Sequence, residues 1–452
     1  MDHRLHPRHC RFEYAEGALM RQEPGKHVLV WGLGITGFES ARVLKQRGHE
    51  VTVWDQALNP VLQTRGHALS SMGIRVLLDH ADCPDLKDVD WVLISPGVRP
   101  SATAAGPIFQ ARLPVYSEIE TASWYCPSRR IIAITGSAGK TTVSTLTAEL
   151  IRSLGFEAVL CGNIGQPWIG ILDKIKPETF VVLELSSFQL KFCSKFSPEI
   201  GVLLNISPNH LDWHADMPDY VASKLNMFRA RSAAHFAVLR KQDQDRYFPE
   251  VAFKSKRIYF DQMTAKTELS DNYRALLAIA SVYGWEEKAV RSVFREFRGL
   301  PHRLEYAGEY DGIRFVNDSK CTTPLSLKWA LNSFENKTVH LIAGGRAKSH
   351  DFELLNDELQ KKVKQIILIG EAAPMLEKCW RECGRIVNAE SLPAALKAAV
   401  QGATPGDTVL LSPGCASFDM FSNYLERGDV FKQCVADYKA ALKGSPSVSG
   451  VK

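Results

Sequence analysis

The stretch RIIAITGSAGKTT, residues 130–142, decides the fold class of this chain more than any other. Its first half is a short β-branched run, which predicts a buried strand, and its second half is a glycine-rich turn that leads into a helix-like segment. Backbone N–H groups of such a turn wrap phosphates, Lys140 reaches the β- and γ-phosphates, and the Thr141 hydroxyl holds Mg²⁺. The stretch is a variant of the common P-loop, because Ile134 stands where that motif has its first glycine.

Short apolar runs of the same kind recur on both sides of this stretch, separated by amphipathic segments. They are HVLVWGLG (27–34), TFVVLELSS (179–187), EIGVLLNIS (199–207), TVHLIAGG (338–345), QIILIGE (365–371) and DTVLLSPG (407–414). Such runs, each followed by Gly, Ser or Asn, are typical of buried parallel strands joined by helices. The chain is therefore predicted to be an α/β protein, with ligands at the carboxyl ends of its strands.

Three blocks of sequence each open with a fresh strand–turn–helix pattern, which predicts three domains. We place them at residues 26–118, 119–298 and 299–452, the last beginning at the Gly/Pro break GLPH (299–302). Residues 1–25 have no apolar h-region and no clear period, so we expect a disordered N-terminal extension and no secretory signal.

The composition excludes several classes of protein. Of 452 residues, 45% are hydrophobic and 23% charged, so neither disorder nor coiled coil describes the whole chain. A net charge of +5 over this length indicates no nucleic-acid partner and no membrane surface, and no apolar run is long enough to span a bilayer. The 10 cysteines form no C-x-x-C pair and fit buried thiols in a reducing cytoplasm. A cytoplasmic monomer is expected.

A second glycine-rich turn, Gly32 to Gly37, follows the run HVLVW and precedes a helix-like stretch. Asp55 ends the next strand, where it can bond a ribose hydroxyl. This is the dinucleotide-binding fingerprint in its usual context, because glycines let the backbone approach a pyrophosphate at a helix N-terminus. The pattern alone does not separate NAD from a UDP-sugar.

Further polar residues stand at the ends of predicted strands. Glu184 ends the run TFVVLE, where it can bind Mg²⁺, and His210 follows the run EIGVLLNIS. In the third block, the loops NDSKCTTP (317–324), GGRAK (344–348) and SPGCASFD (412–419) carry Lys, Arg, Ser or Thr. Converging cations and hydroxyls fit an anionic substrate, either a carboxylate or a phosphate.

These motifs together resemble the Mur ligase family. The segments that carry the resemblance are ITGSAGKTT, GNIG (162–165), ELSSFQL (184–190), the Asn-x₄-His-Leu-Asp stretch (205–212), PHRLE (301–305), NDSKCTTP and LSPGCASFDMF (411–421). The similarity runs from about residue 26 to about residue 432. It implies a Rossmann-like N-terminal domain for a UDP-linked substrate, a P-loop ATPase-type central domain, and a Rossmann-like C-terminal domain for an amino acid.

The branch that adds D-glutamate to UDP-N-acetylmuramoyl-L-alanine is the most similar. The resemblance implies ATP-driven amide formation for peptidoglycan synthesis: the substrate carboxylate attacks the γ-phosphate, and the amine of D-glutamate attacks the resulting acyl phosphate. It implies ATP and two Mg²⁺ ions as cofactors.

The site residues implied by the resemblance fall into four groups. The UDP-linked substrate would contact Leu33, Gly34, Ile35, Thr36, Asp55 and Asn163. ATP would be held by Gly136, Ser137, Ala138, Gly139, Lys140, Thr141, Thr142, Asn272, Arg303 and Asp318. The Mg²⁺ ligands would be Thr141, Glu184, His210 and a carbamylated Lys224, and the catalytic set would be Lys140, Glu184, His210 and Lys224. D-Glutamate would contact Lys320, Thr322, Lys348, Ser417, Phe418 and Tyr424.

Several positions depart from the family pattern. Ala138 stands where the family has Asn, Gly414 where Ala is usual and Tyr424 where Phe is common. Gln56 and Ala57 follow Asp55 where Thr and Arg are frequent, so contacts to the uracil ring are expected to differ. None of these changes removes a charge from the implied chemistry, and we expect an active enzyme.

Three other functions stay open at this stage. A related ligase adding L-glutamate or another amino acid, or a folylpolyglutamate synthase, would share the motifs. An NAD-dependent oxidoreductase would use the glycine-rich turn from Gly32 to Gly37 but would leave the P-loop and Glu184 without a role. A P-loop switch would hydrolyse ATP without ligation.

Overall fold

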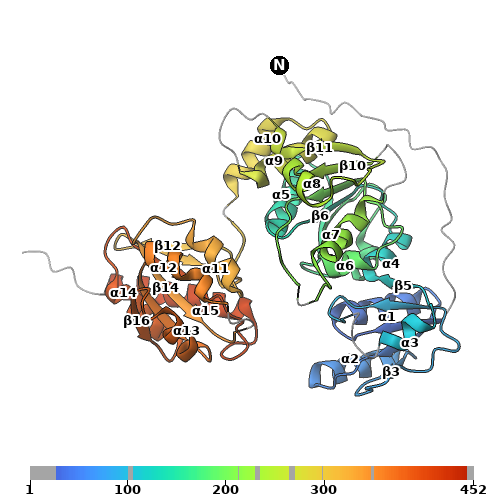
Figure 1. The fold of residues 1–452 in the computed structure, drawn as a ribbon, viewed down its shortest axis with the longest axis horizontal. Helices are drawn as coiled ribbons and strands as arrows, with labels where there is room; N and C mark the ends of the chain where they lie inside the picture. The colour runs from blue at the N-terminus through green and yellow to red at the C-terminus, as the bar shows by residue number, and fades with distance from the viewer. Residues whose placement is uncertain are drawn as a thin grey trace, which may run out of the picture. The chain divides into compact units, whose positions relative to one another are not determined.

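The computed structural model describes residues 27–99, 105–211, 213–229, 235–263, 270–297, 299–347 and 351–444. They form two compact units, one that ends at Phe294 and one that begins at Arg295. In Figure 1 the first unit runs from blue to yellow, and the second is orange to red. The first unit holds two β-sheets and the second unit holds one.

The first sheet is parallel, with the strand order β3-β2-β1-β4-β5. Its strands are β1 (His27–Trp31), β2 (Glu50–Trp54), β3 (Arg75–Leu77), β4 (Trp91–Ile94) and β5 (Val115–Ser117), and its helices are α1 (Ile35–Gln46), α2 (Pro60–Ser71), α3 (Gly106–Gln110) and α4 (Glu118–Tyr125). The chain leaves β1 toward β2 on one side, whereas β4 lies on the other side. The turn after β1 therefore lies at the topological switch point, where ligands bind in such sheets.

Alternating side chains of β1 build two cores, one on each face of this sheet. Val28 and Val30 belong to one apolar cluster, and Leu29 and Trp31 belong to another. A strand buried on both faces needs a continuous apolar run, which is what residues 28–31 supply.

The second sheet is also parallel, in the order β11-β10-β9-β6-β8-β7. Its strands are β6 (Ile131–Thr135), β7 (Ala158–Gly162), β8 (Phe180–Glu184), β9 (Ile200–Leu203), β10 (Phe236–Leu239) and β11 (Lys256–Tyr259). The α-helices are α5 (Lys140–Ser153), α6 (Ser187–Lys191), α7 (Met217–Leu225), α8 (Lys241–Tyr247), α9 (Asp271–Val282) and α10 (Glu287–Glu296), with short 3₁₀ turns η2 (Trp168–Lys174), η3 (Asn226–Phe228) and η4 (Phe260–Gln262). The strand β6 predicted from the P-loop stretch is central, so its carboxyl end opens between β8 and β9.

The sheet of the second unit has the order β12-β13-β17-β14-β15-β16. Its strands are β12 (Glu305–Tyr310), β13 (Ile313–Asn317), β14 (Val339–Gly344), β15 (Val363–Ile369), β16 (Arg385–Asn388) and β17 (Thr408–Leu411). Its helices are α11 (Pro324–Leu331), η5 (Glu353–Leu355), α12 (Asn356–Lys362), α13 (Ala373–Trp380), α14 (Leu392–Gly402) and α15 (Tyr424–Gly444).

One strand pair of this sheet differs from the all-parallel arrangement that the apolar runs suggest. β12 pairs antiparallel with β13 across the two-residue turn Asp311-Gly312, in which both residues have positive φ values, 53° and 71°. Such a turn matches the twist of a tight hairpin, and Asp-Gly is among the pairs it favours. β12 is partly exposed along its length, as an edge strand can be.

The α/β fold class predicted from the sequence is confirmed. Within the described ranges, no helix has both the length and the apolar character needed to cross a membrane.

Candidate active site

Three backbone N–H groups at the turn after β1 and just beyond β2 donate hydrogen bonds to the end of β2. Gly32 has φ 95°, and its N–H donates to the Trp54 carbonyl (2.8 Å). The Leu33 N–H donates to Asp55 Oδ2 (2.7 Å), and the Ala57 N–H donates to Asp55 Oδ1. Asp55, which was predicted at a ribose hydroxyl, therefore already fastens the turn to the end of β2. Each carboxylate oxygen keeps a further lone pair for a ligand.

The other predicted residues of this turn differ in exposure. The side chain of Leu33 is fully buried in the core, so only its backbone can face a ligand, whereas Gly34 and Ile35 are exposed and Thr36 is half-buried. Helix α1 begins at Ile35, with no side-chain cap on Gly34. The free N–H groups of this first turn are suited to a phosphate.

Gly37→Ala is expected to destabilise the first unit, whereas Gly34→Ala is not. A Cβ on Gly37 would lie 1.8 Å from the Gly32 carbonyl oxygen, but no atom lies within 4 Å of a Cβ on Gly34. Overpacking of this kind costs about 1–3 kcal/mol or more, which predicts a Tm lower by several degrees for Gly37→Ala. Thermal unfolding followed by circular dichroism checks this. Equal Tm values for the two variants would contradict the role given to Gly37.

The P-loop after β6 takes a conformation that glycine makes possible. Gly136 has φ 158° and Gly139 has φ 82°, and helix α5 starts at the next residue, Lys140. A Cβ on Gly139 would lie 2.8 Å from Asn272 Oδ1. Asn272, a predicted ATP contact on α9, therefore lies directly against the loop.

The segment after β9 braces the P-loop through side chains. Asn205 Oδ1 accepts the Ala138 N–H (2.8 Å), and Asn205 Nδ2 donates to the Ala138 carbonyl (3.1 Å). The Ser207 N–H donates to Ser137 Oγ (2.9 Å), which also lies 2.8 Å from the Tyr220 hydroxyl. Asn205 thus satisfies the backbone of Ala138, a position where the family has Asn. The sequence analysis gave neither Asn205 nor Tyr220 a role. The available signals were that Asn205 opens the motif 205–212 and that Tyr220 stands near Lys224 in the sequence.

Two lysines converge on one carbonyl oxygen of this loop. Lys140 Nζ lies 3.0 Å and Lys224 Nζ 3.1 Å from the Gly136 oxygen. Lys224 is almost fully buried at the end of α7, and its amine also donates to Thr135 Oγ1 (3.3 Å). Burial, and then the charge of Lys140, hold the pKa of Lys224 well below its usual value. A buried amine that is readily neutral is chemically different from a surface lysine.

A buried carboxylate ends the neighbouring strand β8. Glu184 Oε1 accepts from Asn163 Nδ2 (2.8 Å), and the Asn163 N–H donates to the Glu184 carbonyl (2.8 Å). Glu184 Oε2 is buried and has no hydrogen-bond partner among the described residues. An orphaned anionic oxygen at this depth fits a divalent cation.

His210 is a further predicted Mg²⁺ ligand. His210 is exposed, has φ 56° and packs its ring edge against Phe188, the second residue of α6. Over the described ranges, no cluster of three or more His, Cys, Asp or Glu side chains is assembled for a metal. Mg²⁺ typically takes only one or two protein carboxylates and completes its shell with phosphate oxygens and water, so the single carboxylate of Glu184 suits it better than a full protein cage.

A buried polar chain that sequence reasoning missed supports this end of the sheet. His214 Nδ1 lies 3.0 Å from Asp219 Oδ2, and His214 Nε2 lies 2.9 Å from Ser187 Oγ. Burial lowers the pKa of His214, which keeps the ring neutral and able to link one donor and one acceptor. Ser187 and His214 are themselves buried, so the chain ties the start of α6 to α7 and does not present a nucleophile.

The second unit carries the remaining predicted ATP contacts at the end of β13. Asp318 is buried; its Oδ2 accepts from Ser412 Oγ (2.7 Å) and its Oδ1 from the Leu304 N–H (3.2 Å). Burial raises the pKa of Asp318 to about 6, and the charge of Arg303 opposes that rise. Arg303 and Asp318 are therefore close enough to interact electrostatically.

The predicted amino-acid residues come from two neighbouring loops of the same unit. The Lys320 N–H donates to the His302 carbonyl (2.9 Å), and its amine lies 5.9 Å from the centre of the Tyr424 ring. Thr322 is half-buried, Ser417 is buried and Phe418 is 61% exposed. Lys348 lies outside the described residues.

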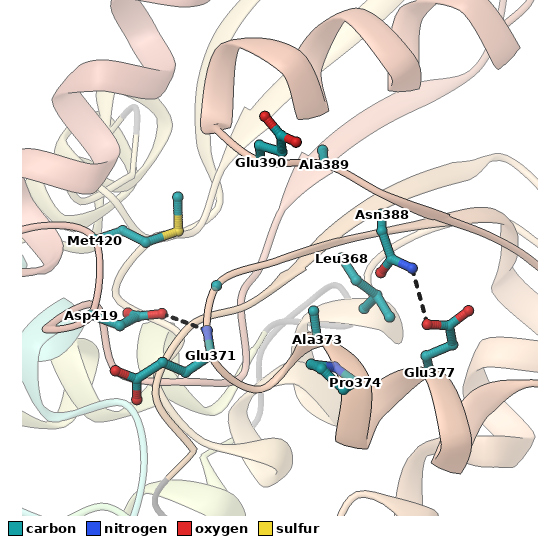
Figure 2. A pocket seen from close by; sticks show the side chains of 11 residues that line it. Leu368, Glu371, Ala373, Pro374, Glu377, Asn388, Ala389, Glu390, Asp419 and Met420 are labelled. Carbon is teal, nitrogen blue, oxygen red and sulfur yellow. Dashed lines mark hydrogen bonds between the residues drawn. The ribbon is translucent and has the colours of Figure 1, made fainter.

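A cavity of about 510 Å³ lies near these loops, at the carboxyl ends of β15 and β16 (Figure 2). Its apolar surface comes from residues such as Leu368 and Met420, and its polar lining is acidic, with Glu371, Glu377, Glu390 and Asp419. Asp419 Oδ2 accepts the Glu371 N–H (2.9 Å), and Glu377 accepts from Asn388. None of the lining residues is among those predicted to contact the amino acid, and a lining rich in carboxylates does not favour a dicarboxylate.

Models of known families match all three parts of the chain. They are the Mur ligase MurD-like N-terminal domain at residues 26–116, the Mur ligase middle domain at 134–281, and the Mur ligase glutamate ligase domain at 302–415. The chain belongs to the Mur ligase family. The resemblance inferred from the motifs is thereby confirmed.

Curated relatives align with nearly the whole length of this chain. A UDP-N-acetylmuramoylalanine–D-glutamate ligase from Pelotomaculum thermopropionicum is 34% identical, over 92% of this chain and 98% of the relative. One from Aquifex aeolicus is 36% identical, over 90% of this chain and 98% of the relative.

Solved structures share the fold at lower identity. The alanine-adding ligase MurC of Thermotoga maritima aligns with a TM-score of 0.54 at 18% identity, over 92% of this chain and 99% of that one. MurF of the same organism, solved with ADP, aligns with 0.55 at 13% identity, over 90% of this chain and 98% of that one.

Proposed function

We propose that this Mur ligase joins D-glutamate to the alanyl carboxylate of UDP-N-acetylmuramoyl-L-alanine in an ATP-dependent reaction of peptidoglycan synthesis. The proposal rests above all on the P-loop, where the amines of Lys140 and Lys224 meet at one carbonyl oxygen near the strand that ends in the buried Glu184. We assign residues 26–118 to the UDP-linked substrate, 119–298 to ATP and 299–452 to the amino acid.

The first step brings two anions together. The alanyl carboxylate oxygen bonds to the γ-phosphorus of ATP, the bond from that phosphorus to the β,γ-bridging oxygen breaks, and ADP leaves, which gives an acyl phosphate. Lys140 and the N–H groups of Gly139 and Lys140 at the start of α5 offset the charge of the phosphates. Mg²⁺, held by Thr141, Glu184 and His210, would supply further positive charge.

The second step forms the amide bond. The neutral amine of D-glutamate attacks the acyl carbon, the tetrahedral intermediate loses a proton from nitrogen, and phosphate departs with the C–O bond electrons. Lys320, Lys348, Thr322 and Ser417 suit the two carboxylates of the incoming amino acid, because they offer two cations and two hydroxyls. Phe418 and Tyr424 would supply apolar contact along its methylene chain.

Lys224 has the environment that carbamate formation needs. Its buried amine donates to the neutral oxygens of Thr135 and Gly136, and its neutral form can attack carbon dioxide, forming an N–C bond and releasing one proton to solvent. The resulting carbamate would carry an anionic oxygen toward the Mg²⁺ site, which the ammonium form cannot.

The carbamate predicts a specific signal. Enzyme equilibrated with ¹³C-bicarbonate should show one slowly exchanging carbamate resonance that is absent from Lys224→Met, and removal of carbon dioxide should lower phosphate release. Lys191→Met, which changes another lysine of the same sheet end, should keep the resonance. A parent spectrum without it would contradict the assignment.

The reaction itself is tested by phosphate release with Mg²⁺-ATP and UDP-N-acetylmuramoyl-L-alanine. We expect release that depends on D-glutamate and is weak with L-glutamate or with no amino acid. A preference for L-glutamate would retain the mechanism but change the substrate. Release that ignores both amino acids would support a P-loop ATPase and contradict ligation.

A cytoplasmic monomer completes the proposal. All residues assigned to substrates belong to one chain, and the described cysteines carry free thiols, as in a reducing compartment.

A further inference from the structure

Arg427, in the first turn of α15, is a buried cation whose hydrogen-bond partners are all neutral. It is 1% exposed, its Nε donates to Ser319 Oγ (3.0 Å), and its Nη2 donates to the carbonyls of Ser319 (2.9 Å) and Cys415 (3.1 Å). Burial lowers its pKa to about 10, which still leaves it charged at neutral pH. The carboxylates of Asp419 and Asp318 act on it electrostatically and oppose this fall. The hydrogen bonds of the guanidinium go to the loops around it, so what those loops carry indicates what Arg427 does.

The guanidinium lies where three loops of the second unit meet. Ser319 belongs to the loop after β13 that carries Lys320 and Thr322, and Cys415 belongs to the loop after β17 that carries Ser417. Gly345 belongs to the loop after β14 that leads to Lys348, and a Cβ there would lie 3.2 Å from Arg427 Nη1. One side chain thus borders every loop assigned to the amino-acid substrate.

Two further contacts fix these loops to one another. The Arg346 N–H donates to the Ala416 carbonyl and the Ala416 N–H to the Arg346 carbonyl, both at 2.9 Å. Ser319 Oγ donates to the Tyr424 carbonyl at the start of α15 (2.8 Å). With the Arg427 bonds added, all three loops and the helix form one frame.

One nitrogen of Arg427 is left over. Nη1 is buried and finds no hydrogen-bond acceptor in the part of the chain that the structure describes. Asp419 Oδ1, which follows the loop after β17, is likewise buried without a hydrogen-bond partner among the described residues, and Asp419 is one of the two carboxylates that act on Arg427.

We propose that Arg427 is the positioning residue of the amino-acid pocket: it holds the three loops in register, so that the lysines and hydroxyls they carry converge on the dicarboxylate. We assign it no contact with the substrate, because its guanidinium bonds Ser319 and Cys415. This inference rests on the proposed function, because it takes the loops to bind D-glutamate.

The test compares substrate dependence in Arg427→Met, Arg427→Lys and Ser319→Ala with the parent. Arg427→Met should raise the KM for D-glutamate about 10-fold or more, while the KM values for ATP and the UDP-linked substrate change less than about twofold. Arg427→Lys retains the charge but loses the planar fork, so we expect an intermediate rise. Ser319→Ala removes one acceptor and should raise the same KM by a few fold. Lys439→Met, a cation at the exposed end of the same helix, serves as the control and should match the parent.

A purely structural role would lower Tm and kcat and leave the three KM values unchanged or raise them together, and either result would overturn the proposal. If Arg427→Met does not fold, the folded variants Arg427→Lys and Ser319→Ala decide: an unchanged KM for D-glutamate in both overturns it. A parent enzyme that does not use D-glutamate at all would instead refute the proposed function, so the two failures are distinguishable.

Discussion

Replacing Lys140 with methionine is expected to lower kcat by about 10³-fold while the protein stays folded. The amine of Lys140 caps the P-loop through the carbonyls of Gly136 and Ser137 and is the cation closest to the phosphates in the proposed reaction. The side chain is half-buried, and its hydrogen bonds to Gly136 and Ser137 stay within the loop itself, so Tm should change little. Phosphate release under saturating substrates measures the loss.

The matched control is Lys176→Met. Lys176 is an exposed lysine of the same unit, ion-paired with Glu157 at 3.3 Å, and surface pairs of this kind contribute little. We expect its kcat to stay within about twofold of the parent. A Lys140→Met enzyme that retains a tenth or more of the parental kcat would contradict the role of the P-loop.

Glu184→Gln should lower kcat by about 10²-fold or more and raise the Mg²⁺ concentration needed for half-maximal rate. The substitution keeps an oxygen that can accept from Asn163, so the local hydrogen bond survives, whereas the negative charge at the orphaned Oε2 is lost. A magnesium titration of phosphate release separates this effect from misfolding. An unchanged Mg²⁺ requirement would exclude Glu184 as a ligand.

Glu118→Gln is the matched control, because Glu118 is another buried carboxyl of the same unit. Its Oε1 accepts the Ile169 N–H (2.6 Å), and burial raises its pKa to about 7. The folded state therefore holds this proton more tightly than the unfolded state. The free energy of unfolding falls as pH rises from the ordinary pKa of a glutamate toward about 7. We expect the Mg²⁺ requirement of Glu118→Gln to match that of the parent. We also expect its Tm, relative to that of the parent at the same pH, to be higher at pH 8 than at pH 5.

Local sequence predicted the strands and the glycine turns well, because their signals are local. The run before Gly136 could only be a buried strand, and a glycine at position 139 is required by its positive φ and by Asn272 beside it. The family resemblance likewise located Glu184 and Lys224, which the structure shows to be buried.

Long-range pairing could not be predicted from the same signals. The Arg427 bonds to Ser319 cross 108 residues, and His214 meets Ser187 across 27 residues, so neither contact leaves a periodic or local trace. Asp55 had a clear motif position, yet its bonds to the Leu33 and Ala57 N–H groups depend on backbone geometry that the motif does not specify.

Amide formation through an acyl phosphate is tested most directly by isotope transfer. The enzyme is incubated with Mg²⁺-ATP, D-glutamate and UDP-N-acetylmuramoyl-L-alanine that carries ¹⁸O in its alanyl carboxylate, and both products are analysed by mass spectrometry. We predict a UDP-linked product that has gained one glutamyl residue, together with phosphate that carries one ¹⁸O atom. Unlabelled phosphate with an unchanged UDP-linked compound would show ATP hydrolysis without ligation and would contradict the proposed function.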